Sequence, residues 1–376
     1  MYISLPRVIS PFGNENDLFL ACVNGERSLV YESFLGKDML VGRINFKLAE
    51  FGKNTEQRYK TRTNQILLSA LLPLQSEIDK LVRIYGTSRI GVVIGTTTTG
   101  VEENYEAFKG KDFDSRKIVL DKNSLSNPAE FARKFLGLKG ICFGVSTACT
   151  SGIKAFACAK NFIDLGICDA VVCGGVDSLN SLTLHGFNSL GVLWDQPSMP
   201  FDKGREGINI GEAAGCFIVC KDEISDYKLS AIGANCDAFH ITQPNPEARE
   251  QSLLIGSLLN KAKMENVDYI NLHATGTLAN DSMEAKAINL TLPNTLASGI
   301  KANIGHTLGA AGAVEAAVCI LAMQNSIVPM QILNELDATI SKINLATTSI
   351  KKEIRNCLNL SFAFGGDNAA MILERV

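Results

Sequence analysis

The chain has 376 residues, of which 46% are hydrophobic and 20% are charged, and its formal net charge is -3. This length exceeds that of one ordinary domain, and the composition is typical of a compact globular protein rather than a disordered one. The slightly acidic balance excludes a general nucleic-acid binder, because such a protein needs a strongly basic face to neutralise phosphates.

The 11 cysteines are scattered along the chain and include no CxxC pair. An odd number without close pairs argues against a disulfide framework in a chain of this length, so reduced thiols are expected. The first residues lack a charged region followed by an apolar signal core, and no run approaches the ~20 apolar residues of a membrane span. We therefore expect a cytoplasmic protein without a membrane span.

The first informative segment runs from residue 53 to residue 70, where a basic polar turn leads into an amphipathic helix. The turn carries a cluster of four cations, namely Lys53, Arg58, Lys60 and Arg62. Such a cluster is usually solvated surface, and the alternative is a docking site for an acidic partner.

From residue 90 onwards, short apolar runs alternate with helical patterns. The runs predict buried strands at residues 90–97, 141–145, 170–173, 215–220, 269–272 and 358–364. Helices are expected to begin after Gly100 and to cover residues 151–163 and 307–323. This alternation predicts an α/β fold with largely parallel, buried strands.

Similar short segments follow the predicted strands in the two halves, in the same order. Residues 97–100 correspond to residues 274–277, residues 149–152 to residues 306–309, and residues 174–177 to residues 365–367. We therefore predict two similar halves, residues 1–225 and residues 226–376. Because open α/β sheets bind ligands beyond the carboxyl ends of their strands, the paired turns should converge on one site.

Cys149 stands where an apolar run ends and a helical pattern begins. At such a position a thiol meets unpaired backbone N–H groups and the positive end of the helix dipole, which favour a thiolate. Cys149 is therefore a candidate nucleophile, and the alternative is a small buried core residue.

Two of the four histidines, His273 and His306, lie at matching strand-end turns, so we expect both beside Cys149. A zinc site made from these three residues is chemically possible, but no closely spaced ligand pair anchors it, and we predict no metal. Lys301 precedes His306 in the same segment, and Glu284 lies in the helix after His273. Because a buried lysine needs a carboxylate partner, we expect a Lys301–Glu284 pair.

Five ordered segments between residue 90 and the C-terminus resemble the motif set of a known family. They cover residues 146–152 (STACTSG), 200–212 (PFD, REG and GE), 273–281 (HATGTLAND), 301–315 (KANIGHTLGAAGAVE) and 361–368 (SFAFGGDN). Together they are similar to the motifs of the elongating β-ketoacyl-acyl carrier protein synthases.

The resemblance implies a thiolase-like fold, in which two similar βαβ-type halves form a layered α-β-α-β-α architecture, and a dimer. It implies an acyltransferase in which Cys149 takes an acyl group from the phosphopantetheine thiol of an acyl carrier protein. His273 and His306 would promote the decarboxylation of malonyl carrier protein, and the carbanion would attack the acyl-cysteine in a Claisen condensation. Lys301 would orient this cluster, with Glu284 as its carboxylate partner.

The resemblance also implies roles around the thiol. Backbone N–H groups of Cys149 and Phe364 would stabilise the oxyanion, and Phe364 with Gly365 would form a gate, although an ordinary core aromatic is the alternative for Phe364. Thr275 and Thr277 are expected as supporting residues. No resident cofactor is implied, because phosphopantetheine arrives on the carrier protein, and the cations between residues 53 and 62 resemble the segment that meets it.

Single residues separate this family from its neighbours. Thiolases have a second cysteine in the region of residues 364–366, initiating synthases have asparagine in place of His306, and non-catalytic partner subunits lack the nucleophile. Asp367 departs from the family, which commonly has threonine there, and Val101 with Glu102 departs from the small or apolar residues expected around the acyl tunnel.

Three alternatives stay open at this stage. The reaction could serve fatty-acid elongation or a specialised polyketide or polyene pathway, such as that of an aryl polyene. The chain could be a homodimer or one subunit of a ketosynthase heterodimer. In the second case it could depend on its partner for activity.

Overall fold

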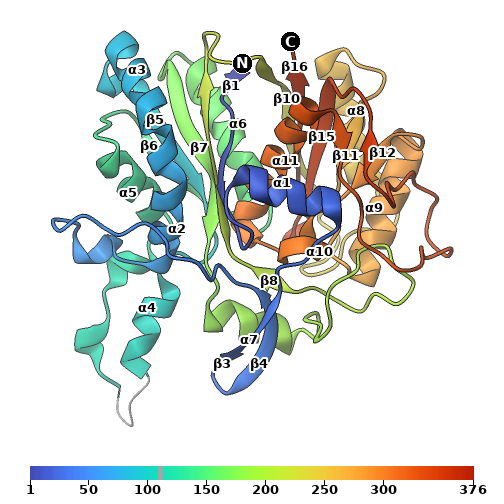
Figure 1. Cartoon of the computed structure of the whole chain (residues 1–376), viewed down its shortest axis with the longest axis horizontal. Helices are drawn as coiled ribbons and strands as arrows, with labels where there is room; N and C mark the ends of the chain where they lie inside the picture. Colours follow the sequence, from blue (N-terminus) through green and yellow to red (C-terminus); the bar gives the residue numbers. More distant parts are fainter. Residues whose placement is uncertain (109–112) are drawn as a thin grey trace.

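The computed structural model describes residues 1–108 and 113–376 and shows helical layers alternating with two groups of strands (Figure 1). The strands follow one path in the order β12-β11-β15-β16-β10-β1-β9-β7-β5-β6, and β2 pairs with β9 beside this path. The two groups meet where β1 pairs with β10. The predicted layered α/β architecture is confirmed.

The first group of strands comes from the N-terminal half of the chain. Its members are β1 (Tyr2–Ile3), β2 (Arg7–Ile9), β5 (Ile90–Gly95), β6 (Cys142–Val145), β7 (Ala170–Asp177) and β9 (Ala213–Cys220). β5 lies between β6 and β7 and is parallel to both, whereas β7 and β9 are antiparallel. Every residue of β5, β7 and β9 is buried, which is why the sequence shows unbroken apolar runs there.

The second group repeats this pairing pattern. Its members are β10 (Tyr227–Cys236), β11 (Tyr269–Asn271), β12 (Leu296–Ser298), β15 (Asn356–Phe362) and β16 (Asp367–Arg375). β11 lies between β12 and β15 and is parallel to both, whereas β15 and β16 are antiparallel. The two halves therefore share one topology. Two of the three predicted correspondences are confirmed, those after β5 and β11 and after β6 and β12, but the third is wrong, because residues 174–177 end β7 whereas residues 365–367 lead into β16, the counterpart of β9.

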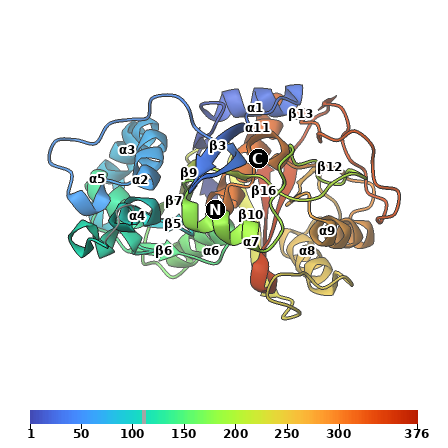
Figure 2. The same ribbon diagram turned by 90° about the horizontal axis from the view of Figure 1, so that it is seen from below.

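Helices cover both outer faces and fill the centre (Figure 2). The outer helices are α2 (Arg62–Leu71), α3 (Gln75–Tyr85) and α5 (Asn127–Phe135) on the first group, and α8 (Arg249–Ala262) and α9 (Leu278–Thr291) on the second. The central helices, α6 (Ser151–Asp164) and α11 (Ala311–Asn325), contact strands of both groups. α6 follows β6 and α11 follows β12, so the central helices occupy equivalent places in the two halves.

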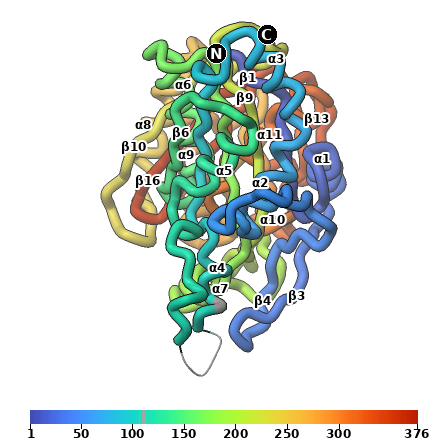
Figure 3. The backbone as a smooth tube through the Cα atoms, turned by 90° about the vertical axis from the view of Figure 1, so that its left-hand side faces the viewer, coloured from blue at the N-terminus to red at the C-terminus, as the bar shows by residue number. Residues whose placement is uncertain are grey.

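Shorter elements complete the fold. They are α1 (Glu15–Asn24), which packs on α11, together with β3 (Val30–Phe34), β4 (Lys37–Gly42), α4 (Val101–Tyr105), α7 (Ser181–Ser189), β8 (Ile210–Gly211), α10 (Lys301–Ile304), β13 (Ile327–Val328) and β14 (Ile350–Lys351). The β3–β4 hairpin, α4 and α7 lie at one end of the molecule (Figure 3).

The central helix α11 is apolar because it lies inside the protein. Its residues from Ala311 to Met323 are all buried. The segment Leu308–Asn325 has the length and composition of a membrane span, yet 89% of it is buried within the fold. Small residues let α6 and α11 approach closely: a Cβ at Gly152 would lie 2.9 Å from the backbone nitrogen of Ala313.

This close approach makes a stability prediction. Gly152→Ala should lower the free energy of unfolding by about 1–3 kcal/mol, because the added methyl group meets backbone atoms that cannot move aside cheaply. Urea unfolding measures the change. The matched control is Gly256→Ala in α8, where no neighbouring atom lies within 4 Å of the new Cβ. The control should be neutral or stabilise the protein by up to about 1 kcal/mol. Equal destabilisation by both variants would contradict the tight helix crossing.

Candidate active site

Cys149 lies in the turn between β6 and α6 and lines a cavity of about 690 Å³. The preceding residue, Ala148, has a φ of 54°, a left-handed conformation that costs a non-glycine residue about 1–2 kcal/mol. Hydrogen bonds hold this strained turn: the Ser151 hydroxyl donates to the carbonyl of Ala148 at 2.6 Å, and the Ser361 hydroxyl donates to the carbonyl of Cys149 at 2.8 Å. The turn places the thiol at the start of α6, as predicted.

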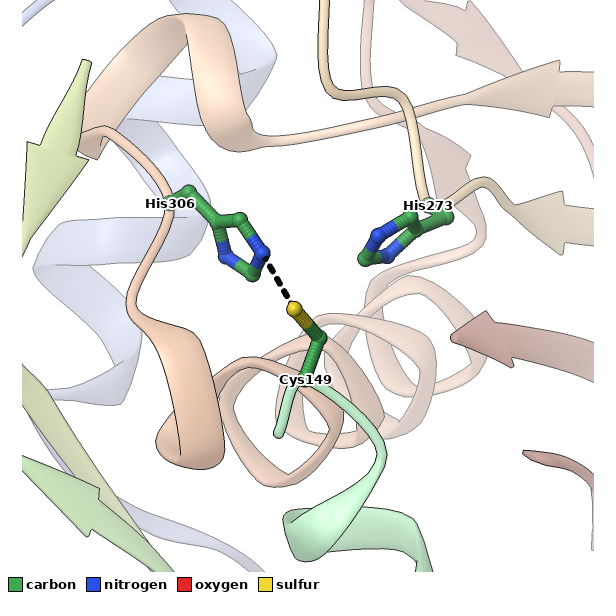
Figure 4. A group of neighbouring side chains, drawn as sticks. All are labelled: Cys149, His273 and His306. Atoms are coloured by element: carbon green, nitrogen blue, oxygen red, sulfur yellow. Dashed lines mark hydrogen bonds between the residues drawn. The ribbon is translucent and has the colours of Figure 1, made fainter. Parts of the chain in front are cut away.

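His306 occupies the equivalent turn of the second half, just before α11. Its Nε2 lies 3.0 Å from Cys149 Sγ (Figure 4). Its Nδ1 accepts the backbone N–H of Leu308 at 3.1 Å. A ring nitrogen that accepts a hydrogen bond carries no proton, so the neutral ring holds its proton on Nε2 and donates toward the sulfur.

His273 follows β11 and lies beside His306, with ring centroids 5.3 Å apart and an interplanar angle of 85°. Lys301 Nζ lies 3.3 Å from His273 Nδ1 and also donates to the His273 carbonyl oxygen. Because an ammonium group can only donate, Nδ1 accepts and the neutral ring again carries its proton on Nε2. The structure therefore brings Cys149, His273, His306 and Lys301 together, and Figure 4 shows the sulfur and both rings pointing toward one another.

Burial controls the charges of these groups. Burial raises the pKa of the Cys149 thiol to about 12, although the Lys301 ammonium and the residue's own N–H oppose it. Burial, with the Lys301 charge, holds the pKa values of His273 and His306 well below 6.5. The resting site therefore contains a neutral thiol and neutral imidazoles. The expected thiolate is contradicted by this raised pKa, because desolvation of the buried thiol outweighs the Lys301 charge and the residue's own N–H.

The partner of Lys301 is Glu315, and the predicted Lys301–Glu284 pair is wrong. Lys301 Nζ lies 2.5 Å from Glu315 Oε1, and the two side chains are 3% and 1% exposed. Glu284 instead accepts the backbone N–H groups of His273 at 2.6 Å and of Ala274 at 2.8 Å, so it fixes the turn that carries His273. Burial raises the pKa of Glu284 to about 8. A signal for Glu315 was present in the sequence, because it is the one charged residue of an otherwise apolar helix.

Asp177, which the sequence suggested only as part of the internal repeat, links the two halves. This residue ends β7, and its side chain is fully buried. Its carboxylate accepts the N–H of Thr97 at 2.9 Å, the hydroxyls of Thr96 and Thr97 at 2.9 and 2.7 Å, and the N–H of Gly309 at 2.7 Å. Gly309 follows His306 closely, so a carboxylate of one half holds the catalytic turn of the other.

The motif at residues 200–212 supports the His273 turn. Arg205 is buried and lies 2.7 Å from an oxygen of Asp337 and 3.4 Å from one of Asp281. Asp281 in turn accepts the N–H groups of Phe201 at 2.8 Å and of Gly276 at 3.2 Å. These contacts tie the loop to the start of α9.

The predicted supporting threonines lie in the same region. The hydroxyls of Thr275 and Thr277 are 3.0 Å apart, both residues line the cavity, and Thr277 caps α9.

The cavity lining falls into an apolar and a polar group. The apolar residues include Val101, Leu182, Phe187, Leu190, Val192, Ile208 and Leu308, and the polar ones include Asp237, Thr242, Gln243, Asn280 and Asn368. Phe364 also lines the cavity, is 37% exposed and packs its ring 5.8 Å from that of Phe187. Phe364 is therefore not a core aromatic, and its position suits the predicted gate. Gly365, with a φ of 85°, donates its N–H to the carbonyl of Ile241 at 2.8 Å.

The four cations of residues 53–62 do not form one surface patch. Arg62 Nε donates to the buried carboxylate of Glu212 at 2.8 Å, which removes Arg62 from the predicted docking cluster. Arg58 lies 2.9 Å from Glu56 and 3.7 Å from Glu130, so nearby acids offset its charge. Lys53 and Lys60 are exposed.

A metal ion would need several ligand atoms close together. Cys149, His273 and His306 each offer one, and these three atoms lie within 4.8 Å of one another. The groups behind the histidines do not suit a metal. A metal-bound histidine donates its other ring N–H to an acceptor, whereas here both Nδ1 atoms face donors, the N–H of Leu308 and the ammonium of Lys301. The ammonium would also repel a cation.

Comparisons with known proteins agree with this geometry. Residues 76–224 match the family model for the N-terminal domain of beta-ketoacyl synthase, and residues 228–334 match the model for its C-terminal domain. The 3-oxoacyl-[acyl-carrier-protein] synthase 2 of Coxiella burnetii is 32% identical over 314 residues, which cover 77% of this chain and 76% of that protein. Nodulation protein E of Rhizobium meliloti is 32% identical over 307 residues, with the same coverage of 77% and 76%.

A solved structure is similar over the whole chain. A chain from the complex of a ketosynthase with its chain length factor, from Xenorhabdus doucetiae, superposes with a TM-score of 0.93 and 31% identity, covering 100% of this chain and 98% of that one. The resemblance inferred from the five motifs is confirmed, and the chain belongs to the beta-ketoacyl synthase family.

Proposed function

We propose that this protein, as a β-ketoacyl-acyl carrier protein synthase, extends an acyl thioester by two carbons with Cys149 as its nucleophile. The observation that carries the proposal is the arrangement of the site: the Cys149 sulfur lies 3.0 Å from a donating Nε2–H of His306, with His273 beside them. The similarity to 3-oxoacyl-[acyl-carrier-protein] synthase 2 of Coxiella burnetii supports this acyltransferase chemistry.

The first step moves the acyl group to Cys149. The sulfur forms a bond to the thioester carbon, the bond from that carbon to the carrier's phosphopantetheine sulfur breaks, and the thiol proton ends on the departing sulfur. The hydrogen bond from His306 Nε2 stabilises negative charge on the Cys149 sulfur as its proton leaves. The backbone N–H groups of Cys149 and Phe364 are the proposed donors to the oxyanion.

The second step decarboxylates malonyl carrier protein. The bond to the carboxylate breaks, carbon dioxide leaves, and the electron pair moves onto the thioester oxygen as an enolate. Two preorganised Nε2–H donors, on His273 and His306, can hold this oxygen in a site that excludes water. Lys301 acts through His273, because its ammonium group keeps the His273 proton on Nε2.

The third step forms the new carbon–carbon bond. The enolate carbon attacks the acyl carbon on Cys149, and the tetrahedral intermediate expels the cysteine sulfur, which takes up a proton from solvent. In this scheme phosphopantetheine enters on the carrier protein, so the chain needs no resident cofactor and no metal, and we place the reaction in the cytoplasm. The acyl carrier protein is the proposed partner.

A second candidate is a ketosynthase subunit that depends on a different partner chain. The Xenorhabdus doucetiae structure, a ketosynthase in complex with its chain length factor, supports it. β6 ends the strand path of the described residues and exposes 47% of Phe143, and such an edge suits pairing with either a second copy or a partner. Turnover by the chain purified alone favours the homodimer, and turnover only after addition of a partner favours the heterodimer.

The nucleophile is tested by intact-mass measurement. Incubation with an acyl-loaded carrier protein should add one acyl group to the wild-type chain and none to Cys149→Gln. The variant should continue to release carbon dioxide from malonyl carrier protein, because the histidines do not need the thiol for that step. Adding His273→Ala or His306→Ala to it should slow this release by about 10²-fold or more, as for the loss of one oxyanion donor. An acyl group on another residue would refute the assignment of Cys149.

The charge state of the site is tested by alkylation. With the pKa of Cys149 near 12, the thiolate fraction rises about tenfold for each pH unit up to pH 10, so the rate of iodoacetamide alkylation should rise in parallel without a plateau. The wild-type chain is compared with Cys149→Gln to subtract reaction at other cysteines. A plateau between pH 7 and 8 would indicate a thiolate–imidazolium pair and contradict a neutral resting site.

The docking surface is tested by charge reversal. Lys53→Glu and Lys60→Glu should together raise the KM for acyl carrier protein by about 5-fold or more, because both lysines are exposed and acidic partners are attracted at long range. The kinetics with a small acyl thioester should not change. Lys263→Glu, at an exposed lysine of the other half, is the control. Equal effects on carrier protein and small thioester would exclude this docking site.

A further inference from the structure

Asp367 is a carboxylate that the proposed reaction does not use, and it lies between the gate loop and the nucleophile. Its Oδ1 lies 2.6 Å from Lys154 Nζ, and its Oδ2 accepts a hydrogen bond from the Thr150 hydroxyl. Thr150 follows Cys149 directly, and Lys154 lies one helical turn further along α6, with its N–H donating to the carbonyl of Thr150. One side chain therefore connects the loop before β16 to the first turn of the nucleophile's helix.

The gate loop, residues 363–366, depends on contacts from both sides. Gly365 and Gly366 have φ values of 85° and 74°, conformations that glycine adopts without cost. On one side, Gly365 donates to the carbonyl of Ile241, and Asp237 donates its N–H to the carbonyl of Gly366 at 2.9 Å. On the other side, the carboxylate of Asp367 reaches α6. A loop of two glycines has little stiffness of its own, so these anchors set its position.

A second carboxylate, Asp177, holds the other catalytic turn in a similar way. Asp177, the last residue of β7, accepts the N–H of Gly309 just before α11, the central helix of the other half. Asp367 binds Thr150 and Lys154 at the start of α6, which is again the central helix of the other half. Each catalytic turn is thus held by a carboxylate from the opposite half, although Asp177 ends β7 and Asp367 begins β16, which are not counterparts in the repeat.

The two carboxylates differ in how firmly they are held. Asp177 is fully buried, whereas the side chains of Lys154 and Asp367 are 23% and 24% exposed, so solvent weakens their attraction. The Asp367 carboxylate still accepts two hydrogen bonds, one of them from an ammonium group, and such charge-assisted bonds fix a geometry well.

We propose that Lys154 and Asp367 are positioning residues that keep the gate loop aligned with Cys149 during acyl transfer. The inference rests on the proposed function, because acyl transfer to Cys149 is the step it serves. Loss of the pair lets the loop with Phe364 shift, and a misplacement of about 1 Å can slow a reaction by up to 10²-fold. His273 and His306 keep their own supports, Glu284, Lys301 and the N–H of Leu308, so decarboxylation is spared.

The experiment separates these two steps. Asp367→Asn and Lys154→Gln should each lower the rate of Cys149 acylation by a small acyl thioester by about 10-fold, with KM within about twofold of the wild-type value. Malonyl decarboxylation should stay within about threefold. The exchanged pair, Lys154→Glu with Asp367→Lys, should recover most of the lost acylation rate, which a merely structural role would not predict.

A second ion pair on the same helix is the matched control. Lys160 and Asp164 pair on α6, further from Cys149, so Lys160→Gln and Asp164→Asn should leave acylation unchanged. Acylation within twofold of wild type in both test variants overturns the proposal, and so does an equal loss of acylation and decarboxylation, or a control that slows acylation as much. If the wild-type chain acquires no acyl group, the proposed function itself fails, and this inference fails with it.

Discussion

The side chain of Lys301 is 3% exposed, and an ammonium group taken from water without a partner costs several kcal/mol. Nearby groups supply the partners that the buried ammonium needs. Glu315 supplies the opposite charge, and the carbonyl oxygen and Nδ1 of His273 accept hydrogen bonds from the ammonium. The same cation lowers the pKa values of both histidines and opposes the rise in the pKa of Cys149. One buried charge therefore sets the tautomer of His273 and helps to keep both rings neutral.

A neutral site suits a reaction in which negative charge develops on oxygen. Hydrogen bonds from fixed donors are stronger where water is excluded, and they need no rearrangement as the enolate or the oxyanion forms. The cost is a thiol with a pKa near 12, which is a poor nucleophile at rest. His306 offsets this cost, because its Nε2–H donates to the sulfur as the proton leaves. Burial thus weakens the nucleophile but strengthens the donors that both later steps require.

Local patterns predicted the parts of this structure that local physics determines. The strands β5, β7 and β9 are buried on both faces, so their apolar runs were visible, and the similar segments that follow the strands predicted one site for Cys149, His273 and His306. β10 escaped prediction because it has no continuous apolar run and its alternating burial stops after Ala231. The division at residue 225 stays a prediction.

Contacts between distant segments could not be predicted. Arg62 and Glu212 are 150 residues apart, and nothing near either residue indicates that they pair. The choice of Glu284 over Glu315 failed for a different reason: Glu315 is only 14 residues from Lys301 and is the one charged residue of α11, and this signal was overlooked. The pKa of Cys149 also follows from burial, which the packing of both halves creates and no single motif shows.

Two carboxylates from opposite halves give the site one rigid and one adjustable wall. Asp177 at the end of β7 and Asp367 at the start of β16 each accept a hydrogen bond from the turn that leads into the central helix of the opposite half. Asp177 is fully buried and accepts several hydrogen bonds, so the turn that carries His306 is fixed. Asp367 is partly exposed. The three residues before it are Phe364, which lines the cavity, and two glycines. A carrier-bound acyl chain must enter and leave past a wall of this site. The wall that contains Phe364 is held by the ion pair between Asp367 and Lys154, and solvent weakens the attraction between these two side chains.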